Sequence, residues 1–296
     1  MKVEQIKIDE KNKIPVYVLG AEPRILLMAG IHGNEKTGIA ILKRIIKQLK
    51  NSSKSYPVAI IPCVNLSAYR ANSRANPKDG VDFNRVFPVS EIKSQSYKIA
   101  KAIQDSAEKF TTVIDIHVFT GQHTLMCGVD LNISKGRIQK KIKNMMSQIG
   151  MEAICRIDHT SEPKKDGSLC AYLQHKNILA FGIELPPLEV LTKSNSDMIT
   201  NNLIALAKGF QKRTKIRKLR LYTRLPVFSE YAGFFSPNKI PGLEVKKGDN
   251  IGNITEKNQQ KLNINSPFNG RLISISYKKY VKNGDKLFVI GKKVKS

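Results

Sequence analysis

Short apolar runs alternate with stretches of helical periodicity through the first two thirds of the chain, and this alternation limits the fold more than any other feature. The predicted strands lie at residues 3–8, 14–19, 24–30, 57–62, 111–116, 152–157 and 178–184, and the predicted helices at 36–50, 92–109, 135–149 and 196–212, with a short helix after residue 168. Strands that alternate with helices in this way are typical of α/β proteins. The sequence therefore predicts a mixed, largely parallel sheet flanked by helices.

The character of the sequence changes near residue 215. Helical periodicity ends there, and short apolar runs alternate with turn sequences such as KKGDNIGN, NSPFNG and KNGD. We therefore expect two domains, an α/β domain of residues 1–214 and a small all-β domain of residues 215–296. The basic stretch at 211–224 joins them and is interpreted as a solvated linker and strand edge.

The charge of the chain is strongly basic and unevenly distributed. Lys and Arg number 50 against 24 Asp and Glu, and residues 211–296 alone hold 20 basic and 5 acidic residues. A basic surface can attract nucleic acid or anionic substrates. No zinc-finger, RNA-recognition or helix-turn-helix pattern accompanies the charge, and Trp is absent. We therefore do not expect a nucleic-acid partner, although a catalytically idle, basic binding module remains an alternative.

The sequence favours a cytoplasmic protein without a membrane partner. Its first residues lack the apolar core of a signal peptide, and no apolar run is long enough to cross a bilayer. The four cysteines are widely spaced and form no Cys-x-x-Cys pair. We interpret them as small buried hydrophobic residues rather than as disulfides or zinc ligands.

Three polar side chains sit where predicted strands end. His32 and Glu35, in MAGIHGNEKTG (28–38), lie on the turn between a strand and a helix, and His117 ends the strand in TTVIDIHVFTG (111–121). Ligands bind at the carboxyl ends of strands in open α/β sheets. Two imidazoles and one carboxylate are a common catalytic zinc set. Asp115 faces the same side as His117 and could orient it from outside the ligand set.

Two further stretches supply charged groups suited to a reaction. The loop SRANPKDGVDFNRVFP (73–88) contains Arg74, Asn84 and Arg85, and guanidinium groups can hold a carboxylate or steady an oxyanion. Surface charge in a basic protein is the alternative interpretation of each arginine. Glu184 ends the apolar strand in NILAFGIELPP (177–187), where a carboxylate is costly unless it is paired or functional. Beside a metal-activated water it would suit a general base that then protonates a leaving amine.

The order of these motifs along the chain resembles the zinc carboxypeptidase superfamily. Within it, His-x-x-Glu, Arg-x-Asn-Pro…Asp-x-Asn-Arg-x-Phe-Pro, Asp-x-His and the strand-end Glu are similar to the succinylglutamate desuccinylase and aspartoacylase branch. The residues GFFSP…GLEVKKGDNIGNI…INSPFNGRLISIS…VKNGDKLFVIG resemble the small β domain that follows the catalytic domain in that branch. The resemblance therefore covers nearly the whole chain.

The resemblance implies a role for each candidate residue. It implies one zinc ion per chain, held by His32, Glu35 and His117. It also implies Glu184 as the catalytic glutamate, Arg74 polarising the scissile carbonyl, and Asn84 with Arg85 gripping the α-carboxylate of the substrate. Two departures bear on the pocket: Phe83 stands where the family often has Leu, and Phe119 and His123 occupy a segment where a small residue is more usual after the histidine. They put the identity of the substrate in doubt more than the chemistry.

The expected function is that of a zinc-dependent hydrolase that removes the acyl group from an N-acyl amino acid or a related small molecule carrying a carboxylate. A zinc carboxypeptidase that acts on a peptide or a cell-wall stem peptide would use the same groups and is the alternative. Residues 1–214 would form the catalytic domain. A homo-oligomer is compatible with the sequence.

Overall fold

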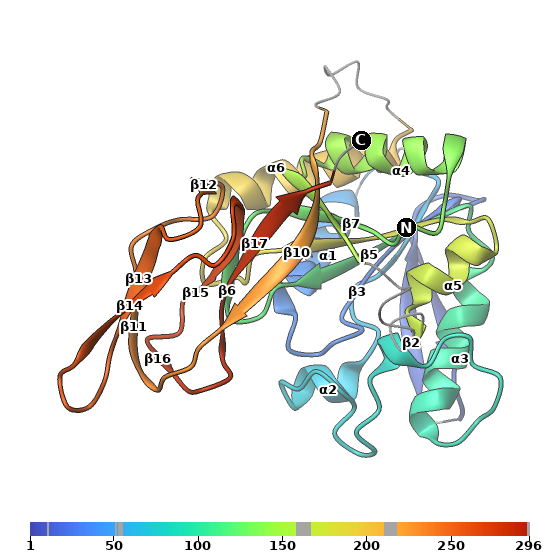
Figure 1. The fold of residues 1–296 in the computed structure, drawn as a ribbon. Coiled ribbons are helices and arrows are strands. Elements are labelled where there is room, and N and C mark those ends of the chain that lie inside the picture. Colours follow the sequence, from blue (N-terminus) through green and yellow to red (C-terminus); the bar gives the residue numbers. More distant parts are fainter. Residues whose placement is uncertain (11, 51, 53–55, 158–166, 210–217, 295–296) are drawn as a thin grey trace.

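A large mixed sheet runs through the molecule and carries most of its elements (Figure 1). The computed structural model describes residues 1–296 except 11, 51, 53–55, 158–166, 210–217 and 295–296. The strand order is β1-β2-β4-β3-β5-β9-β7-β8-β10-β17-β15-β12, and β6 pairs with β15. Its strands are β1 (Lys2–Lys7), β2 (Lys13–Val18), β3 (Ile25–Ala29), β4 (Val58–Ile61), β5 (Thr112–Val118), β6 (Gln122–Thr124), β7 (Cys127–Asp130), β8 (Ala153–Arg156), β9 (Leu179–Leu185), β10 (Leu221–Phe228), β12 (Glu244–Val245), β15 (Gly270–Ser276) and β17 (Lys286–Lys293).

Helices cover both faces of the part of the sheet that runs from β4 to β8. They are α1 (Lys36–Leu49), α2 (Leu66–Arg70), α3 (Gln95–Ala107), α4 (Gly136–Ile149), α5 (Leu169–His175) and α6 (Lys193–Ala207), with a 3₁₀ turn η1 (Phe83–Arg85). Alternate residues of each strand face opposite helix layers. Leu27 of β3 packs in the core formed with α1, α4 and α6, and Leu26 packs in the core formed with α3 and α5. The α/β prediction is therefore confirmed.

The C-terminal strands form two groups. Strands β10, β17, β15 and β12 continue the main sheet, because β10 pairs with β8 in parallel register, Leu221 opposite Ile154. Strands β11 (Gly233–Pro237), β13 (Asn250–Thr255), β14 (Lys261–Asn265) and β16 (Tyr280–Val281) form a separate antiparallel sheet. The predicted small all-β region is therefore present. The predicted domain boundary at 214/215 falls among residues outside the described part of the chain.

Several sequence predictions differ from the structure in detail. The stretch at 63–90 contains α2 and η1, which were not predicted, and β6 and β7 were missed. The last predicted helix begins at Lys193 rather than at 196 and its described part ends at Ala207; residues 210–212 lie outside the described residues. All four cysteines are free, as predicted; Cys127, Cys155 and Cys170 are buried, whereas Cys63 was expected to be buried and is only half-buried. Among the described residues, no helix combines the length and the apolar character needed to cross a membrane.

Candidate active site

The loop between β3 and α1 places His32 and Glu35 at the carboxyl edge of the sheet. Gly30 has a φ of +71°, a conformation that glycine adopts without strain. Gly33 passes so close to α2 that an added Cβ would lie 1.9 Å from the backbone carbon of Ala68. Gly30 thus allows the turn, and Gly33 allows the close approach to α2. Both His32 and Glu35 are buried as a result.

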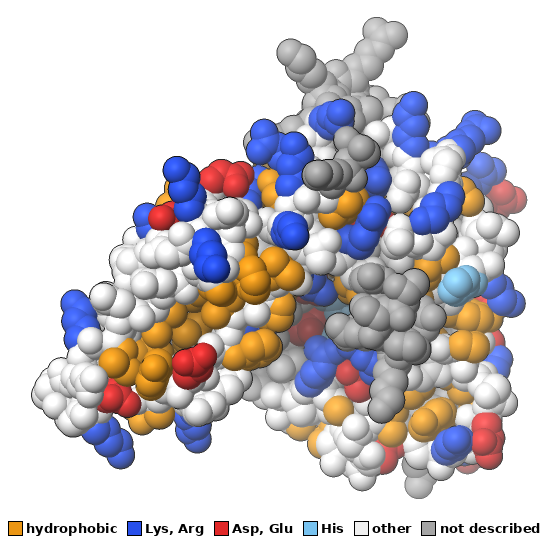
Figure 2. All heavy atoms as spheres, in the orientation of Figure 1, with side chains coloured by type: hydrophobic (Ala, Val, Ile, Leu, Met, Phe, Trp, Pro, Cys, Tyr) orange, Lys and Arg blue, Asp and Glu red, His pale blue; other side chains and the backbone are white. Residues whose placement is uncertain are grey.

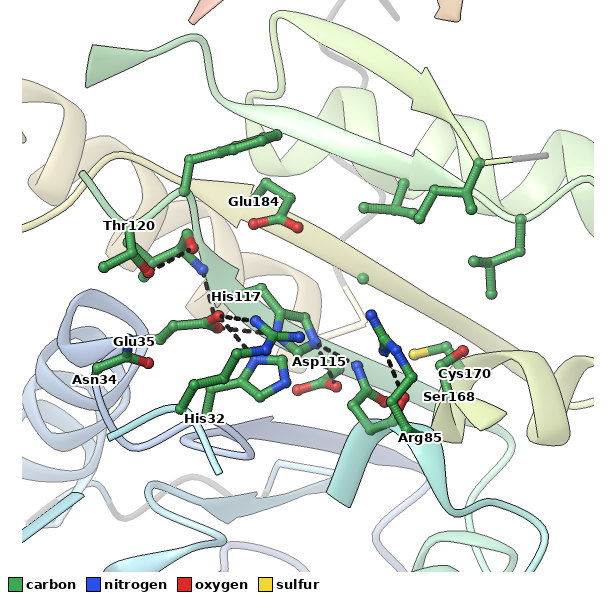
Figure 3. A pocket seen from close by; sticks show the side chains of 18 of the residues that line it. His32, Asn34, Glu35, Arg85, Asp115, His117, Thr120, Ser168, Cys170 and Glu184 are labelled. Carbon is green, nitrogen blue, oxygen red and sulfur yellow. Dashed lines mark hydrogen bonds and ion pairs between the residues drawn. The ribbon is translucent and has the colours of Figure 1, made fainter. Parts of the chain in front are cut away.

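The two histidines and the glutamate converge in space, as the sequence predicted (Figure 3). Glu35 bridges the imidazoles: its Oε1 lies 2.7 Å from Nδ1 of His32 and its Oε2 lies 2.9 Å from Nδ1 of His117. The backbone N–H of Val118 also donates to Oε2 at 3.2 Å. One potential ligand atom from each of the three residues falls within 4.8 Å of the others. The three side chains therefore offer one compact set of metal-ligating atoms.

A carboxylate holds the outer nitrogen of each histidine. Asp115 Oδ2 lies 2.7 Å from Nε2 of His117, which is the orienting role expected for Asp115. Asp82 Oδ1 lies 3.1 Å from Nε2 of His32, a role that sequence reasoning missed. Carboxylates in this position fix the orientation of a ligating imidazole and raise its basicity. Asp82 could have been found from its place in DFNR, two residues before Asn84.

The electrostatics of the cluster suit a bound cation. Burial alone would raise the pKa of Glu35, but the charge of His117 and hydrogen bonds with both histidines lower that pKa to about 2. Burial would lower the pKa of His117, yet the Asp115 and Glu35 carboxylates raise it well above the usual value. The carboxylates of the site therefore attract positive charge. A divalent cation would replace the protons that the imidazoles otherwise bind, so the donor set fits zinc.

Glu184 lies next to this cluster on the neighbouring strand. Strands β5 and β9 are parallel, and their register sets Glu184 opposite His117. Figure 3 shows the Glu184 carboxylate beside the cluster, separate from the three candidate ligands. The side chain is half-buried, and burial raises the pKa of its carboxyl although the charge of His117 opposes the shift. A raised pKa favours a group that must both accept and return a proton.

The loop between α2 and α3 supplies the other predicted residues. Arg74 Nη1 lies 3.5 Å from Glu35 Oε1, and Arg74 Nε donates to Asp82 Oδ2 at 3.1 Å. Arg74 therefore reaches the cluster from the solvent side. Its side chain keeps 47% of its surface exposed, which leaves room for contact with a ligand.

Asn84 and Arg85 lie on η1 and line the same cavity as Arg74. Asn84 Oδ1 accepts a hydrogen bond from the Leu169 N–H at 3.1 Å, which directs its amide nitrogen toward His117 at 3.5 Å from Nε2. Because Nε2 already contacts Asp115, the Asn84 amide protons are available to a ligand. Arg85 Nη1 donates to the Asn84 carbonyl oxygen at 2.6 Å. All seven predicted site residues thus line one cavity of about 410 Å³.

The cavity also has cationic lining that sequence reasoning missed. Arg224 on β10 and Lys286 on β17 reach it from the C-terminal strands, which the sequence indicated only as a basic linker and a β module. In the strand order β7 and β8 stand between β9 and β10, yet Arg224 and Lys286 line the same cavity as Glu184. No local motif in the sequence marks them.

Several solved structures share the fold of this chain. A succinylglutamate desuccinylase from Silicibacter sp. TM1040 superposes with a TM-score of 0.78 at 20% identity, over 96% of this chain and 89% of that one. A product-bound ectoine utilization protein from Ruegeria pomeroyi gives 0.77 at 21% identity, over 95% and 89% of the two chains. A succinylglutamate desuccinylase/aspartoacylase from Rhodobacter sphaeroides gives 0.77 at 17% identity, over 96% and 90%. This chain therefore has the fold of these proteins along nearly its whole length.

Comparisons of the sequence then identify the family. The profile of the succinylglutamate desuccinylase/aspartoacylase catalytic domain matches residues 21–206, and the chain belongs to that family. The N-alpha-acetyl-L-2,4-diaminobutyric acid deacetylase of Halomonas elongata is 38% identical over 89 residues. That aligned segment covers 29% of this chain and 26% of the relative.

Proposed function

We propose that this protein hydrolyses the amide bond of an N-acyl amino acid at a site that holds one zinc ion per chain. The observation that carries the proposal is the convergence of His32, Glu35 and His117 with Glu184 opposite His117 on the adjacent strand. Membership of the desuccinylase and aspartoacylase family supports it. So does the likeness to a deacetylase over part of the chain.

The metal would be held by the two Nδ1 atoms and the Glu35 carboxylate. When bound there, zinc would polarise the substrate carbonyl and make water more acidic. Asp82 and Asp115 hold the two imidazoles with their Nδ1 atoms toward Glu35, so the ligand geometry is set before a metal arrives.

The side chains around the cluster would bind the substrate, stabilise the developing charge and transfer the proton. Arg85 and the Asn84 amide would bind the α-carboxylate of the substrate and so fix the position of the amide bond, which supplies much of the rate by orientation. Arg74 would donate to the carbonyl oxygen as negative charge develops on it. Glu184 would accept a proton from the attacking water and pass it to the nitrogen of the leaving amine.

Metal analysis combined with an amine-release assay tests this proposal. Purified protein loaded with zinc should bind one equivalent and release free amino acid from a panel of N-acetyl and N-succinyl amino acids. His117→Ala should lose the zinc and remain folded, because its side chain lies at the rim of the sheet. Stoichiometric zinc in that variant would overturn the ligand assignment. Release from dipeptides in preference to acyl amino acids would identify a carboxypeptidase instead.

A further inference from the structure

The start of α5 lies directly against η1, the turn that carries Asn84 and Arg85. The Phe87 N–H donates to the Gly167 carbonyl oxygen at 3.0 Å. The Leu169 N–H donates to Asn84 Oδ1 at 3.1 Å, although the two residues are 85 positions apart in the chain. The turn η1 is therefore held by a segment outside its own loop.

Gly167 approaches η1 so closely that no side chain fits there. An added Cβ would lie 2.4 Å from the Arg85 carbonyl oxygen and 2.5 Å from the Arg85 carbonyl carbon, whereas 3.4–4 Å is an ordinary contact. Gly167 does not have a positive φ, so its backbone conformation does not itself require glycine. The missing side chain therefore serves the contact with Arg85. Both Arg85 atoms belong to the backbone, which cannot rotate away as a side chain can.

The backbone of η1 determines where the two polar side chains lie. Arg85 Nη1 donates to the Asn84 carbonyl oxygen at 2.6 Å, so the Arg85 side chain is folded back onto its own turn. A displacement of that backbone would carry the guanidinium with it. Asn84 depends on α5 more directly. Because the Leu169 N–H occupies Asn84 Oδ1, the amide nitrogen of Asn84 is the group left to face the cavity.

The start of α5 is itself firmly placed. The Leu169 side chain is fully buried in the same core as Phe83, the first residue of η1. Ser168 caps α5 with its hydroxyl, and Figure 3 shows Ser168 at the same cavity as Arg85. The start of α5 and η1 therefore share hydrogen bonds and a hydrophobic core, and a change in one must be felt by the other.

We propose that Gly167 and Leu169 are positioning residues that hold Arg85 and Asn84 in the geometry that binds the α-carboxylate of the substrate. The inference rests on the proposed function, which assigns that binding to Asn84 and Arg85. Neither positioning residue belongs to the described residues that line the cavity. Gly167 acts through the backbone of Arg85, and Leu169 acts through the amide of Asn84.

Gly167→Ala tests the first contact. The zinc-loaded variant is assayed with N-acetyl-L-alanine and with N-acetyl-L-alaninamide, which lacks only the α-carboxylate. We expect KM for the acid to rise at least about tenfold with a smaller fall in kcat, because a misplacement of about 1 Å can cost a hundredfold. The penalty should be smaller for the amide, and the zinc content should not change. Thr192→Ala removes the cap of α6, where Thr192 Oγ1 accepts from the Asn195 N–H at 3.2 Å, and controls for a general loss of stability.

A double-variant cycle separates positioning from a general effect on the enzyme. Because Gly167→Ala acts through Arg85, it should add little to the rise in KM when Arg85→Ala is already present. Rises in KM that multiply would show that the two residues act independently, and the inference would be wrong. An equal rise in KM for the acid and the amide would also overturn it.

Leu169→Pro and Leu169→Val form a matched pair for the second contact. Leu169 is the first residue of α5, where proline is well tolerated, and Ser168 has φ −83° and ψ 146°, which a following proline permits. Both variants lose part of the buried side chain, but only proline removes the N–H that holds Asn84. Leu169→Pro should therefore raise KM for the acid several-fold above the value for Leu169→Val. Equal values would exclude the role of Leu169.

Binding measurements distinguish a failure of this inference from a failure of the proposed function. Calorimetry follows the binding of N-acetyl-L-alanine and of its amide to zinc-loaded Glu184→Gln enzyme, with and without Gly167→Ala. Gly167→Ala should raise Kd at least about tenfold for the acid and much less for the amide. If this pattern held while the wild type released no amino acid from any acyl amino acid, the proposed function would fail and the inference would stand. If the pattern were missing, the inference would fail whatever the enzyme hydrolyses.

Discussion

At the scale of single residues, Glu184 and a neighbouring surface glutamate provide a direct comparison. Glu184 would move a proton in the transition state, so Glu184→Gln should keep its zinc and lose about 10²–10⁴-fold in kcat. Glu189 lies five residues further on and is exposed, so Glu189→Gln should retain full activity. Steady-state kinetics with metal analysis measures both. A Glu184→Gln enzyme within threefold of the wild type would exclude Glu184 as the proton carrier.

Arg85 should affect substrate binding more than the chemical step, because the substrate carboxylate that it would hold is charged in both the ground state and the transition state. Arg85→Ala should raise KM strongly, with a smaller fall in kcat from poorer orientation. Substrates with an amidated α-carboxylate should be poor for the wild type, and the Arg85→Ala penalty should be smaller for them. Arg70→Ala removes an exposed arginine of α2 and serves as the control. The same penalty on free-acid and amidated substrates would show that Arg85 does not grip the carboxylate.

At the scale of elements, the strands and site residues that a local sequence pattern marks were predicted correctly. Strand-end His117 and Glu184 were found because apolar runs of β5 and β9 precede them, and parallel pairing then puts them side by side. Strand β7, with the sequence CGVD, was missed because a glycine and an aspartate interrupt its apolar residues, whereas the equally short β4 is a continuous apolar run. Arg224 was missed for another reason: its place in the cavity depends on the pairing of β10 with β8, more than 60 residues away in the chain. Contacts between residues that lie so far apart in the chain cannot be recognised from a local sequence pattern.

The close passage of the β3–α1 loop over α2 allows a test of the site's framework. A Cβ at Gly33 would meet the backbone of Ala68 and Tyr69 at 1.9–2.3 Å, and backbone cannot move aside as a side chain can. Gly33→Ala should therefore destabilise the fold by roughly 1–3 kcal/mol and loosen the proposed metal ligands His32 and Glu35. Gly182→Ala is the control for stability, because its nearest contact would be an ordinary 3.6 Å. Calorimetric melting and zinc titration measure the two effects. An unchanged melting temperature for Gly33→Ala would contradict the packing argument.

At the scale of the whole molecule, a small apolar cluster joins the α/β part to the C-terminal strands. Cys127 and Cys155 of β7 and β8 pack there with Tyr222, Ile273 and Val289 of β10, β15 and β17. The main sheet also crosses between the two parts without interruption in its strand order. Shared core and shared sheet make the stability of each part depend on the other. A boundary near residue 215 would then mark a change in sequence character rather than a border between two independent folding units.

Ile273 tests this coupling, because it is fully buried within the joining cluster. Ile273→Ala should cost about 2–5 kcal/mol through lost contacts and the cavity it leaves. If the molecule unfolds as one unit, calorimetry should show a single transition that shifts as a whole to lower temperature, and zinc release should shift with it. Ile240→Ala removes the same side chain from a site that is 62% exposed and should leave the transition in place. Two resolved transitions, of which only one moved in Ile273→Ala, would instead show that the C-terminal strands unfold as an independent domain. The cationic lining of the cavity would then come from a part that can separate from the proposed metal ligands, and the cavity would be complete only when that part is docked.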